Sequence, residues 1–385
     1  MQKNYQFTPK NLVLVGGGHS HAITLKRFAN QPLPGVNLTL ITPDQYTPYS
    51  GMLPGYIGGF YNYFQCHINL QTLCQSAHTN LHLEQVIGLD WKNQQVLCTN
   101  QKVIKFDFIS IDIGSTPAKL SIPGAAEYTI AVKPVKQFLE HWYKLQETVT
   151  KNPLKPVNIS IVGGGAGGVE LAFSILAGLQ KIGCKHLELH LWQRTQELMP
   201  NHHPSVRKII QDILINKGVK LHLGETVSQI TPIPNNQREI KSLSGLIVHS
   251  DRVFWVTQAS AAEWIKNSGI ETDKNGFIAV NNCLQSINYP QLFAAGDIAT
   301  MIHYHLPKAG VFAVRQGKYL AENLQRIVLN QPLKSYQPQT TYLSLIGTGD
   351  GRALATKGNF TLPPHQLLWF VKNWIDRRFM AQFPE

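Results

Sequence analysis

A glycine-rich turn that follows a short apolar stretch occurs twice in this chain of 385 residues. The first copy reads Leu-Val-Leu-Val-Gly-Gly-Gly over 12–18, and the second reads Ile-Ser-Ile-Val-Gly-Gly-Gly-Ala-Gly-Gly over 159–168. Each copy predicts a strand, a tight turn and the start of a helix. Such a turn lets backbone approach a pyrophosphate, which the helix N-terminus holds through its N–H groups and its dipole. Two copies therefore predict two dinucleotides on one chain, an arrangement typical of electron transfer between them.

Apolar stretches that suit buried strands alternate with stretches that suit helices along most of the chain. We expect strands over 12–15, 36–41, 159–162, 187–192 and 252–256, and helices over 22–28, 135–149, 166–180 and 309–328. This alternation is typical of parallel sheets covered by helices. The sequence therefore predicts an α/β fold with two Rossmann-like dinucleotide-binding units and a small C-terminal region.

The net charge of +12 favours anionic partners such as cofactor phosphates or an acidic membrane surface. No lysine and arginine tract of the nucleic-acid-binding type is present, so we expect no nucleic acid partner. The five cysteines include no Cys-x-x-Cys pair, which favours a reducing cytoplasm over a disulfide or zinc framework. The apolar run near the N-terminus is better explained as a strand than as a secretion signal, and no stretch approaches the ~20 apolar residues of a membrane span.

The first copy departs from the usual pattern at one position. Gly16, Gly17 and Gly18 supply the turn, but after His19 and Ser20 comes His21, where close packing normally requires glycine or alanine. Because His19 and His21 lie in this turn, and His303 and His305 have no acidic pair nearby, we expect no metal site.

Residues at two later places in the chain could complete a dinucleotide site around the first copy. At the end of the next predicted strand, either Thr42 or Asp44 could bond a ribose hydroxyl. The later strand and turn of 292–299 present Gly296 and Asp297, and this carboxylate could face the ribityl hydroxyls of FAD. The alternative is that Asp297 merely caps the following helix.

The second copy is complete at Gly163, Gly165 and Gly168, with Ala166 and Gly167 between the last two glycines. At the end of its next strand stand Gln193 and Arg194 instead of an acid. An acid at this place selects the ribose hydroxyl of NAD, whereas arginine can accept the 2′-phosphate of NADP. The sequence favours NADPH, and NADH remains open because Arg194 could equally be a plain surface residue.

Several stretches together resemble the FAD-dependent pyridine nucleotide-disulfide oxidoreductase superfamily. They are Val-Gly-Gly-Gly-His-Ser-His, Tyr-Thr-Pro-Tyr-Ser-Gly-Met-Leu-Pro-Gly (46–55), Val-Gly-Gly-Gly-Ala-Gly-Gly-Val-Glu-Leu-Ala (162–172) and Phe-Ala-Ala-Gly-Asp (293–297). The likeness is closer to the branch without the disulfide, which holds type II NADH dehydrogenases and sulfide:quinone reductases. The segments 307–317, 343–353 and 374–380 are most similar to the flavoprotein module fused to selenide, water dikinase.

This resemblance implies a domain organisation and a set of residue roles. An FAD-binding domain would comprise 1–118 and 276–328, an NAD(P)H-binding domain 119–275, and a C-terminal region 329–385. Thr47, Pro48 and Tyr49 would lie along the isoalloxazine, and Lys308 near its N1/C2 edge. Glu170 would face the nicotinamide amide, and Gln316 would lie toward the second substrate. Gly114, which ends another predicted strand, belongs to the expected FAD site.

The expected activity is hydride transfer from NAD(P)H to FAD, followed by electron transfer to a quinone or another small acceptor near Tyr49, Lys308 and Gln316. No redox disulfide takes part. One alternative is a sulfide- or selenide-linked flavin reductase, although the lack of a cysteine pair argues against a sulfur relay. Another is a redox-sensing protein that binds FAD and NAD(P)H with little turnover.

The last predicted helix, 367–380, is amphipathic, with an apolar face and an opposite face that carries Lys372, Asn373, Asp376 and Arg377. Its 14 residues reach only ~21 Å, too short to cross a bilayer. It could pack on its own chain, pack on the mate of a homodimer, or lie in a membrane interface. The last case would make this cytoplasmic protein peripheral to the inner face of the membrane.

Overall fold

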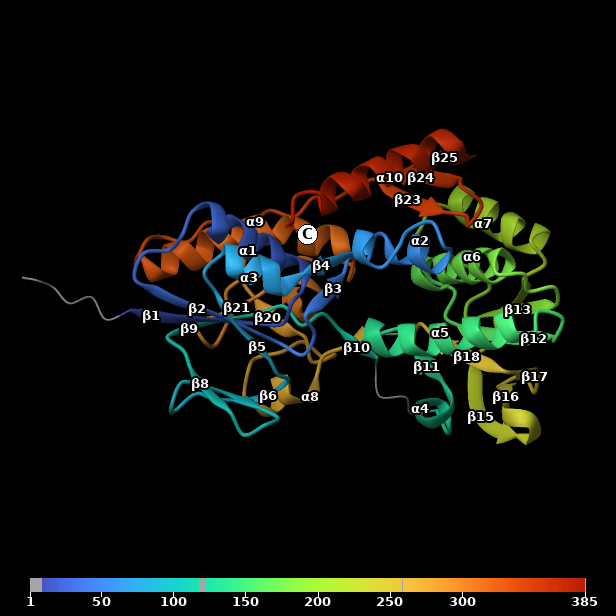
Figure 1. Ribbon diagram of the computed structural model, residues 1–385, viewed down its shortest axis with the longest axis horizontal. Coiled ribbons are helices and arrows are strands. Elements are labelled where there is room, and N and C mark those ends of the chain that lie inside the picture. Colours follow the sequence, from blue (N-terminus) through green and yellow to red (C-terminus); the bar gives the residue numbers. More distant parts are fainter. Residues whose placement is uncertain (1–8, 118–121, 258, 385) are drawn as a thin grey trace, which may run out of the picture.

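Two parallel sheets form the two halves of the molecule in the computed structural model, which describes residues 9–117, 122–257 and 259–384 (Figure 1). The predicted domain boundary between 118 and 119 lies outside the described residues. In both sheets every strand pair is parallel, which confirms the predicted α/β fold with two Rossmann-like units.

The first sheet has the strand order β21-β9-β1-β2-β5. Its strands are β1 (Lys10–Val15), β2 (Val36–Thr42), β5 (Asn80–Leu83), β9 (Phe108–Ile111) and β21 (Leu292–Ala294). The central strand β1 is fully buried from Leu12 to Val15, as its unbroken apolar run predicts. Helix α1 (His19–Asn30) follows the first glycine turn and packs along α9 (Gly310–Val328). A side chain at Gly317 would press on Ile23, so this glycine lets the two helices approach closely.

The second sheet has the strand order β11-β18-β12-β13-β14. Its strands are β11 (Ile130–Ala131), β12 (Val157–Val162), β13 (Leu187–Gln193), β14 (Lys220–Leu223) and β18 (Arg252–Trp255). The helices of this half are α4 (Ala125–Tyr128), α5 (Val135–Lys151), α6 (Ala166–Lys181) and α7 (Pro204–Asn216). Helix α6 follows the second glycine turn and is apolar almost all round, because it packs on β12 and β13 inside and on α2 (Leu53–Ile57) outside.

Smaller elements surround the two sheets. Antiparallel sheets are formed by β6 (Val86–Asp90), β7 (Gln95–Cys98) and β8 (Val103–Lys105), and by β15 (Val227–Ile233), β16 (Gln237–Ser242) and β17 (Ile247–Ser250). Two-stranded pairs join β3 (Tyr46–Pro48) to β4 (His67–Asn69), β10 (Thr116–Pro117) to β19 (Ala259–Ser260), and β20 (Ile278–Val280) to β22 (Ala299–Met301). Short helices are α3 (Leu70–Ser76), α8 (Glu263–Asn267), η1 (Phe64–Cys66), η2 (Pro234–Asn236) and η3 (Gly296–Ile298).

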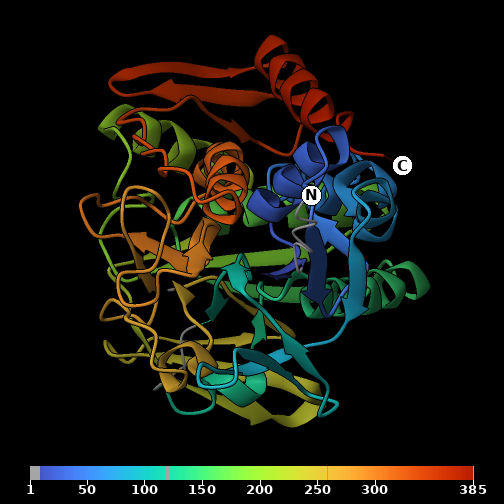
Figure 2. The same ribbon diagram turned by 90° about the vertical axis from the view of Figure 1, so that its left-hand side faces the viewer.

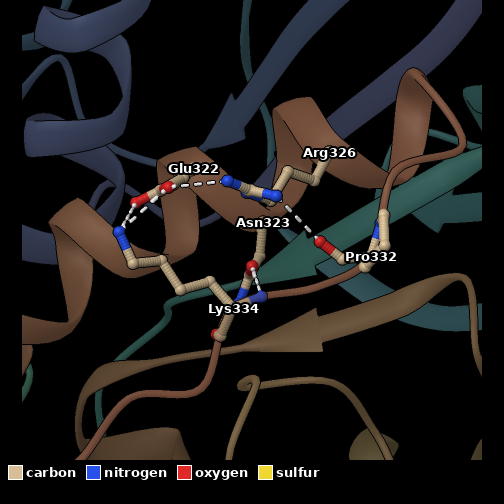
Figure 3. A network of polar contacts seen from close by, with 5 residues as sticks. All are labelled: Glu322, Asn323, Arg326, Pro332 and Lys334. Carbon is tan, nitrogen blue, oxygen red and sulfur yellow. Dashed lines mark hydrogen bonds and ion pairs between the residues drawn. The ribbon is translucent and has the colours of Figure 1, made fainter.

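The C-terminal end of α9 is tied to the segment that follows it (Figure 3). The side chain of the fully buried Asn323 accepts a hydrogen bond from the Lys334 backbone N–H at 2.7 Å and donates to the Lys334 carbonyl at 2.9 Å. Glu322 pairs with both Arg326 and Lys334 around this contact. These bonds fix the direction in which the chain leaves α9 for the C-terminal region.

The C-terminal region forms a layer along one edge of the molecule, above both halves (Figures 1 and 2). It consists of the antiparallel strands β23 (Ser344–Gly347), β24 (Ala353–Lys357) and β25 (Phe360–His365), followed by α10 (Gln366–Met380). Strand β23 packs on α6 and β25 on α7, while α10 packs on β24 and on η1. The region thus covers parts of both halves.

Candidate active site

The first glycine turn packs its backbone against the end of β9. Gly16 has a φ of +95°, a conformation that favours glycine, and a side chain there would collide with the carbonyl of Asp112. The N–H of Gly18 donates to this same carbonyl at 3.1 Å. A side chain at Gly18 would collide with the carboxylate of Asp112. The turn therefore requires glycine at both positions and leaves bare backbone, which suits a pyrophosphate.

Asp112 caps the helix that starts at this turn. Its carboxylate is buried and accepts the backbone N–H of Ser20 at 2.8 Å and that of His21 at 3.1 Å. Burial raises the pKa of Asp112 to about 7, although the two N–H donors act in the opposite direction. Sequence reasoning missed this residue. The available signal was an acid in Ile-Asp-Ile-Gly (111–114), at the end of a strand that neighbours the glycine turn.

The side chain of His21 explains the departure from the usual glycine pattern. Its Nδ1 lies 2.7 Å from the carbonyl of Gly16, and its Nε2 lies 2.8 Å from the hydroxyl of Ser110. Because a carbonyl can only accept, Nδ1 carries the hydrogen and Nε2 accepts from Ser110. Burial lowers the pKa of His21 to about 4, so the ring is neutral at pH 7. The imidazole thus replaces close helix packing by two buried hydrogen bonds.

The two carboxylates that were expected to bind FAD hydroxyls, Asp44 and Asp297, are both ion-paired. Asp44 lies 2.7 Å from Lys136, and Asp297 lies 2.7 Å from Lys133. Ser115 also donates to Asp297, at 3.4 Å. The two lysines lie at and just before the start of α5, so the second half of the molecule reaches across to the first.

The other residues expected around FAD lie in or just after strands of the first half. Thr42 ends β2 beside Gly17 and is buried, while Thr47 and Pro48 belong to β3. The carbonyl of Pro48 accepts a hydrogen bond from Nε2 of His19 at 3.2 Å. Gly114 has a φ of +70° and open space where a side chain would project.

Tyr49 contacts the C-terminal helix. Its ring stacks on Phe379 with centroids 4.4 Å apart, and its hydroxyl is hydrogen-bonded to Asp376. Tyr49 does not line the cavity described below, whereas its neighbour Ser50 does.

The second glycine turn repeats the first without a bulky residue. Gly163 has a φ of +121°, and a side chain at Gly168 would collide with the carbonyl of Gly163. Gly165 precedes Ala166, the first residue of α6, and Gly167 lines the cavity described below.

The two residues at the end of β13 differ in their contacts. The side-chain oxygen of Gln193 accepts the N–H of Gly164 at 3.0 Å, so Gln193 braces the second glycine turn. Arg194 is exposed and makes no hydrogen bond or ion pair with any described residue. Of the two, Arg194 is therefore the side chain available to a ligand phosphate.

A cavity of about 340 Å³ lies where the two halves meet. Glu170 on α6 and Lys133 just before α5 face it from the second half, and Ser50, Ser115 and Lys308 face it from the first. Burial raises the pKa of Glu170, whose carboxylate accepts a backbone hydrogen bond from Gly347. The structure therefore brings Glu170 and Lys308, residues 138 positions apart in the chain, to one space.

Lys308 and Gln316 have different surroundings, although both line a second, much smaller pocket. Lys308 Nζ donates to the carbonyl of Ala299 at 2.7 Å and to the hydroxyl of Thr300 at 3.0 Å, and burial lowers its pKa to about 8. Gln316 is 3 % exposed and accepts the N–H of Gly296 at 2.7 Å, so it braces the turn before Asp297. It does not reach the large cavity.

Helix α10 presents its faces in an unexpected way. Lys372 and Asp376, 7 % and 5 % exposed, form an ion pair at 2.7 Å on the buried face, and Lys372 also donates to the carbonyl of Gly51 at 2.7 Å. The outer face carries large exposed apolar side chains, namely Leu367, Phe370, Val371, Trp374 and Ile375. The helix does pack on its own chain, but two residues of the face that the sequence predicts as polar, Lys372 and Asp376, are turned inward, while Arg377 of that face is exposed.

Comparison with known proteins gives several relatives of moderate similarity. Ferroptosis suppressor protein 1 of Mus musculus is 27 % identical over 282 residues, which cover 71 % of this chain and 70 % of that protein. Demethylphylloquinone reductase NdbB of Synechocystis is 27 % identical, with 74 % and 70 % covered. The type II NADH:quinone oxidoreductase of Haemophilus influenzae is 26 % identical, with 63 % and 61 % covered.

Solved structures share the fold over nearly the whole chain. NDH2 of Plasmodium falciparum in complex with NADH superposes with a TM-score of 0.79 at 14 % identity, covering 97 % of both chains. The sulfide:quinone oxidoreductase of Aquifex aeolicus gives 0.78 at 18 % identity, covering 97 % of this chain and 92 % of the other. The family model of the pyridine nucleotide-disulphide oxidoreductases matches residues 10–317, and this chain belongs to that family.

Proposed function

We propose that this chain is an FAD-dependent NAD(P)H dehydrogenase that reduces a quinone without a redox disulfide. The observation that carries the proposal is the cavity between the two dinucleotide-binding halves, which Glu170 and Lys308 face from opposite sides. When bound, FAD accepts a hydride from NAD(P)H and passes two electrons to the acceptor. Relatives that are named as quinone reductases support this choice of acceptor.

The first glycine turn has the shape that a flavin dinucleotide needs. Its bare backbone at Gly16 and Gly18 and the start of α1 would hold the pyrophosphate. Asp44 would bond a ribose hydroxyl and Asp297 the ribityl chain, which requires both to exchange their present lysine partners. Lys308 would supply positive charge beside the isoalloxazine, where negative charge develops on reduction.

The second glycine turn would hold the nicotinamide dinucleotide. Its pyrophosphate would lie at the start of α6 over Gly163 and Gly165, and Arg194 would accept a 2′-phosphate. Glu170 would hold the nicotinamide amide inside the cavity. Arg194, which has no partner among the described residues, supports NADPH as the preferred donor.

A sulfur relay through the protein has little support. All five cysteines are free thiols, and four of them are buried: Cys66, Cys74, Cys98 and Cys184. Burial raises the pKa of each of these four thiols, which disfavours the reactive thiolate. The sulfide alternative therefore rests on a shared fold alone.

One experiment tests the activity directly. The purified protein should be yellow, should bleach anaerobically on addition of NADH or NADPH, and should recover its colour when a short-chain quinone is added. A colourless protein that FAD cannot reconstitute would overturn the proposal, and reduction without quinone turnover would point to a redox sensor.

The glycine turns offer a matched variant for the same assay. In Gly168→Val the new side chain collides with Gly163, so the nicotinamide site should be lost while the FAD site remains. We expect a yellow protein whose rate of bleaching by NADPH falls by at least about 100-fold. Dithionite, which needs no nicotinamide site, should still bleach it.

We further propose that α10 makes peripheral contact with a membrane. Within the described residues, none of the helices combines the length and the apolarity needed to cross a lipid bilayer. The outer face of α10 is apolar and exposed, and Arg377 and Arg378 near its end suit anionic headgroups. Such contact would bring the protein to a lipid-soluble quinone.

A further inference from the structure

Lys308 is held by a chain of polar contacts that ends on Asp273. Its Nζ donates to the hydroxyl oxygen of Thr300 at 3.0 Å, and that hydroxyl donates to Asp273 Oδ2 at 2.9 Å. The directions are unambiguous, because an ammonium can only donate and a carboxylate can only accept. The Thr300 hydroxyl thus links the Lys308 ammonium to the Asp273 carboxylate. We call Lys308, Thr300 and Asp273 the relay.

Asp273 is itself fixed. Its second oxygen, Oδ1, accepts the backbone N–H of Asn275 at 2.8 Å and that of Phe277 at 3.1 Å. Thr300 belongs to β22, which pairs with β20, the strand that follows the turn at Asp273. Phe277 closes the arrangement, since its ring lies 3.9 Å from Lys308 Nζ.

These contacts explain how a buried lysine keeps its charge. Burial lowers the pKa of Lys308 to about 8, and the nearby carboxylates of Asp273 and Asp297 oppose that effect. Of the two, Asp297 already pairs with Lys133 and would turn to FAD. Across the cavity stands Glu170. Of Asp273, Asp297 and Glu170, Asp273 is therefore the one that neither pairs with another cation among the described residues nor is assigned to a proposed ligand.

We propose that Asp273 is a positioning residue which, through the hydroxyl of Thr300, holds the Lys308 ammonium charged and in place at the wall of the cavity. The proposal rests on the proposed function only in placing Lys308 beside FAD. Its consequence for catalysis is indirect. Asp273 touches no reacting atom, but it keeps the positive charge that favours the reduced flavin present up to a higher pH.

The direct test measures the amine of Lys308 itself. The rate at which acetic anhydride labels Lys308, followed by mass spectrometry across pH 6–10, reports the pKa of that amine whether or not flavin is present. Asp273→Asn keeps the acceptor for the turn but removes the charge, and Thr300→Val removes the relay at constant shape. We expect each to lower the pKa by about one unit and to raise labelling at pH 7 about fivefold.

Controls separate the relay from a general loss of charge. Glu271→Gln removes a negative charge two residues away, from an exposed side chain, and should leave the labelling profile unchanged. In FAD-loaded protein, Asp273→Asn and Thr300→Val should lower the midpoint potential of the flavin at pH 8, whereas Glu271→Gln should not. An unchanged labelling profile in both relay variants, or an equal shift in Glu271→Gln, would overturn the proposal even if the protein proves to be a flavoprotein.

Discussion

The imidazole of His21 occupies a place where a dinucleotide-binding turn normally admits only a small side chain. It fits because Ser110 and the carbonyl of Gly16 satisfy both ring nitrogens inside the protein. Asp112 next to it binds two backbone N–H groups of α1. A neutral histidine thus stands where glycine is usual, and a buried carboxyl from the end of β9 binds the N–H groups at the start of the helix.

The pH dependence of the free energy of unfolding should reveal the proton that Asp112 binds in the folded state. Its pKa rises from 3.8 to about 7 on folding, so the folded state binds a proton that the unfolded state releases. The contribution of Asp112 is therefore fully present below pH 4 and is lost as pH rises to about 7. In Asp112→Asn this loss is absent. The free energy of unfolding of Asp112→Asn, relative to wild type, should rise between pH 4 and 7 by at most about 4 kcal/mol.

Urea denaturation at a series of pH values measures this difference. The neutral His21 acts with the opposite sign, since its pKa falls to about 4, but it is present in both proteins and cancels in the comparison. A stability difference that stays constant across this range would show that Asp112 does not hold the proton.

Arg194 should set the choice between the two nicotinamide donors. Arg194→Gln removes a charge that has no partner among the described residues, so the fold should be unaffected. We expect the KM for NADPH to rise about tenfold or more, because a charged hydrogen bond to phosphate is lost, while the KM for NADH stays within about twofold. Equal effects on both donors would exclude a phosphate contact.

Helix α10 inverts the usual relation between polarity and burial. Its ion pair of Lys372 and Asp376 faces the protein, whereas Phe370 and Trp374 face outward. Removing one partner of a buried ion pair is strongly destabilising, because it leaves the other charge buried without compensation. The face with Lys372 and Asp376 therefore holds the helix on the protein, and the exposed apolar face is free to contact another apolar surface.

The outer face of α10 should be responsible for membrane binding. The triple variant Leu367→Ser, Phe370→Ser and Trp374→Ser removes three side chains that are each at least 59 % exposed. Binding to phosphatidylglycerol vesicles, measured by sedimentation, should weaken by more than about 100-fold, since each side chain contributes about 1.5–3 kcal/mol.

A control uses exposed leucines elsewhere. Leu154→Ser with Leu243→Ser alters residues that are 70 % and 76 % exposed in other parts of the chain and should not change vesicle binding. If the wild-type protein does not bind vesicles but sediments as a dimer, and the triple variant sediments as a monomer, the outer face binds a second copy instead.

Sequence reasoning predicted those features of the whole molecule that depend on residues close together in the chain. The two strand–glycine–helix units, the boundaries of α6 and α9 to within a residue or two, and the parallel sheets follow from short-range patterns. The burial of Lys372 does not, because its partner, the carbonyl of Gly51, lies 321 residues away. Asp112 was missed for the same reason: its role depends on the turn at Gly18, which a linear reading does not bring beside it.

The first sheet is also discontinuous in the chain, and this has a consequence for how the protein is made. Strand β21 (Leu292–Ala294) completes a sheet whose other strands precede residue 112, and α9 packs on α1. During synthesis the second sheet is therefore fully translated, and free to fold, while the first still lacks an edge strand and a covering helix. Cofactor loading should accordingly be a late event, and a ribosome stalled before residue 292 should display a nascent chain that cannot retain FAD.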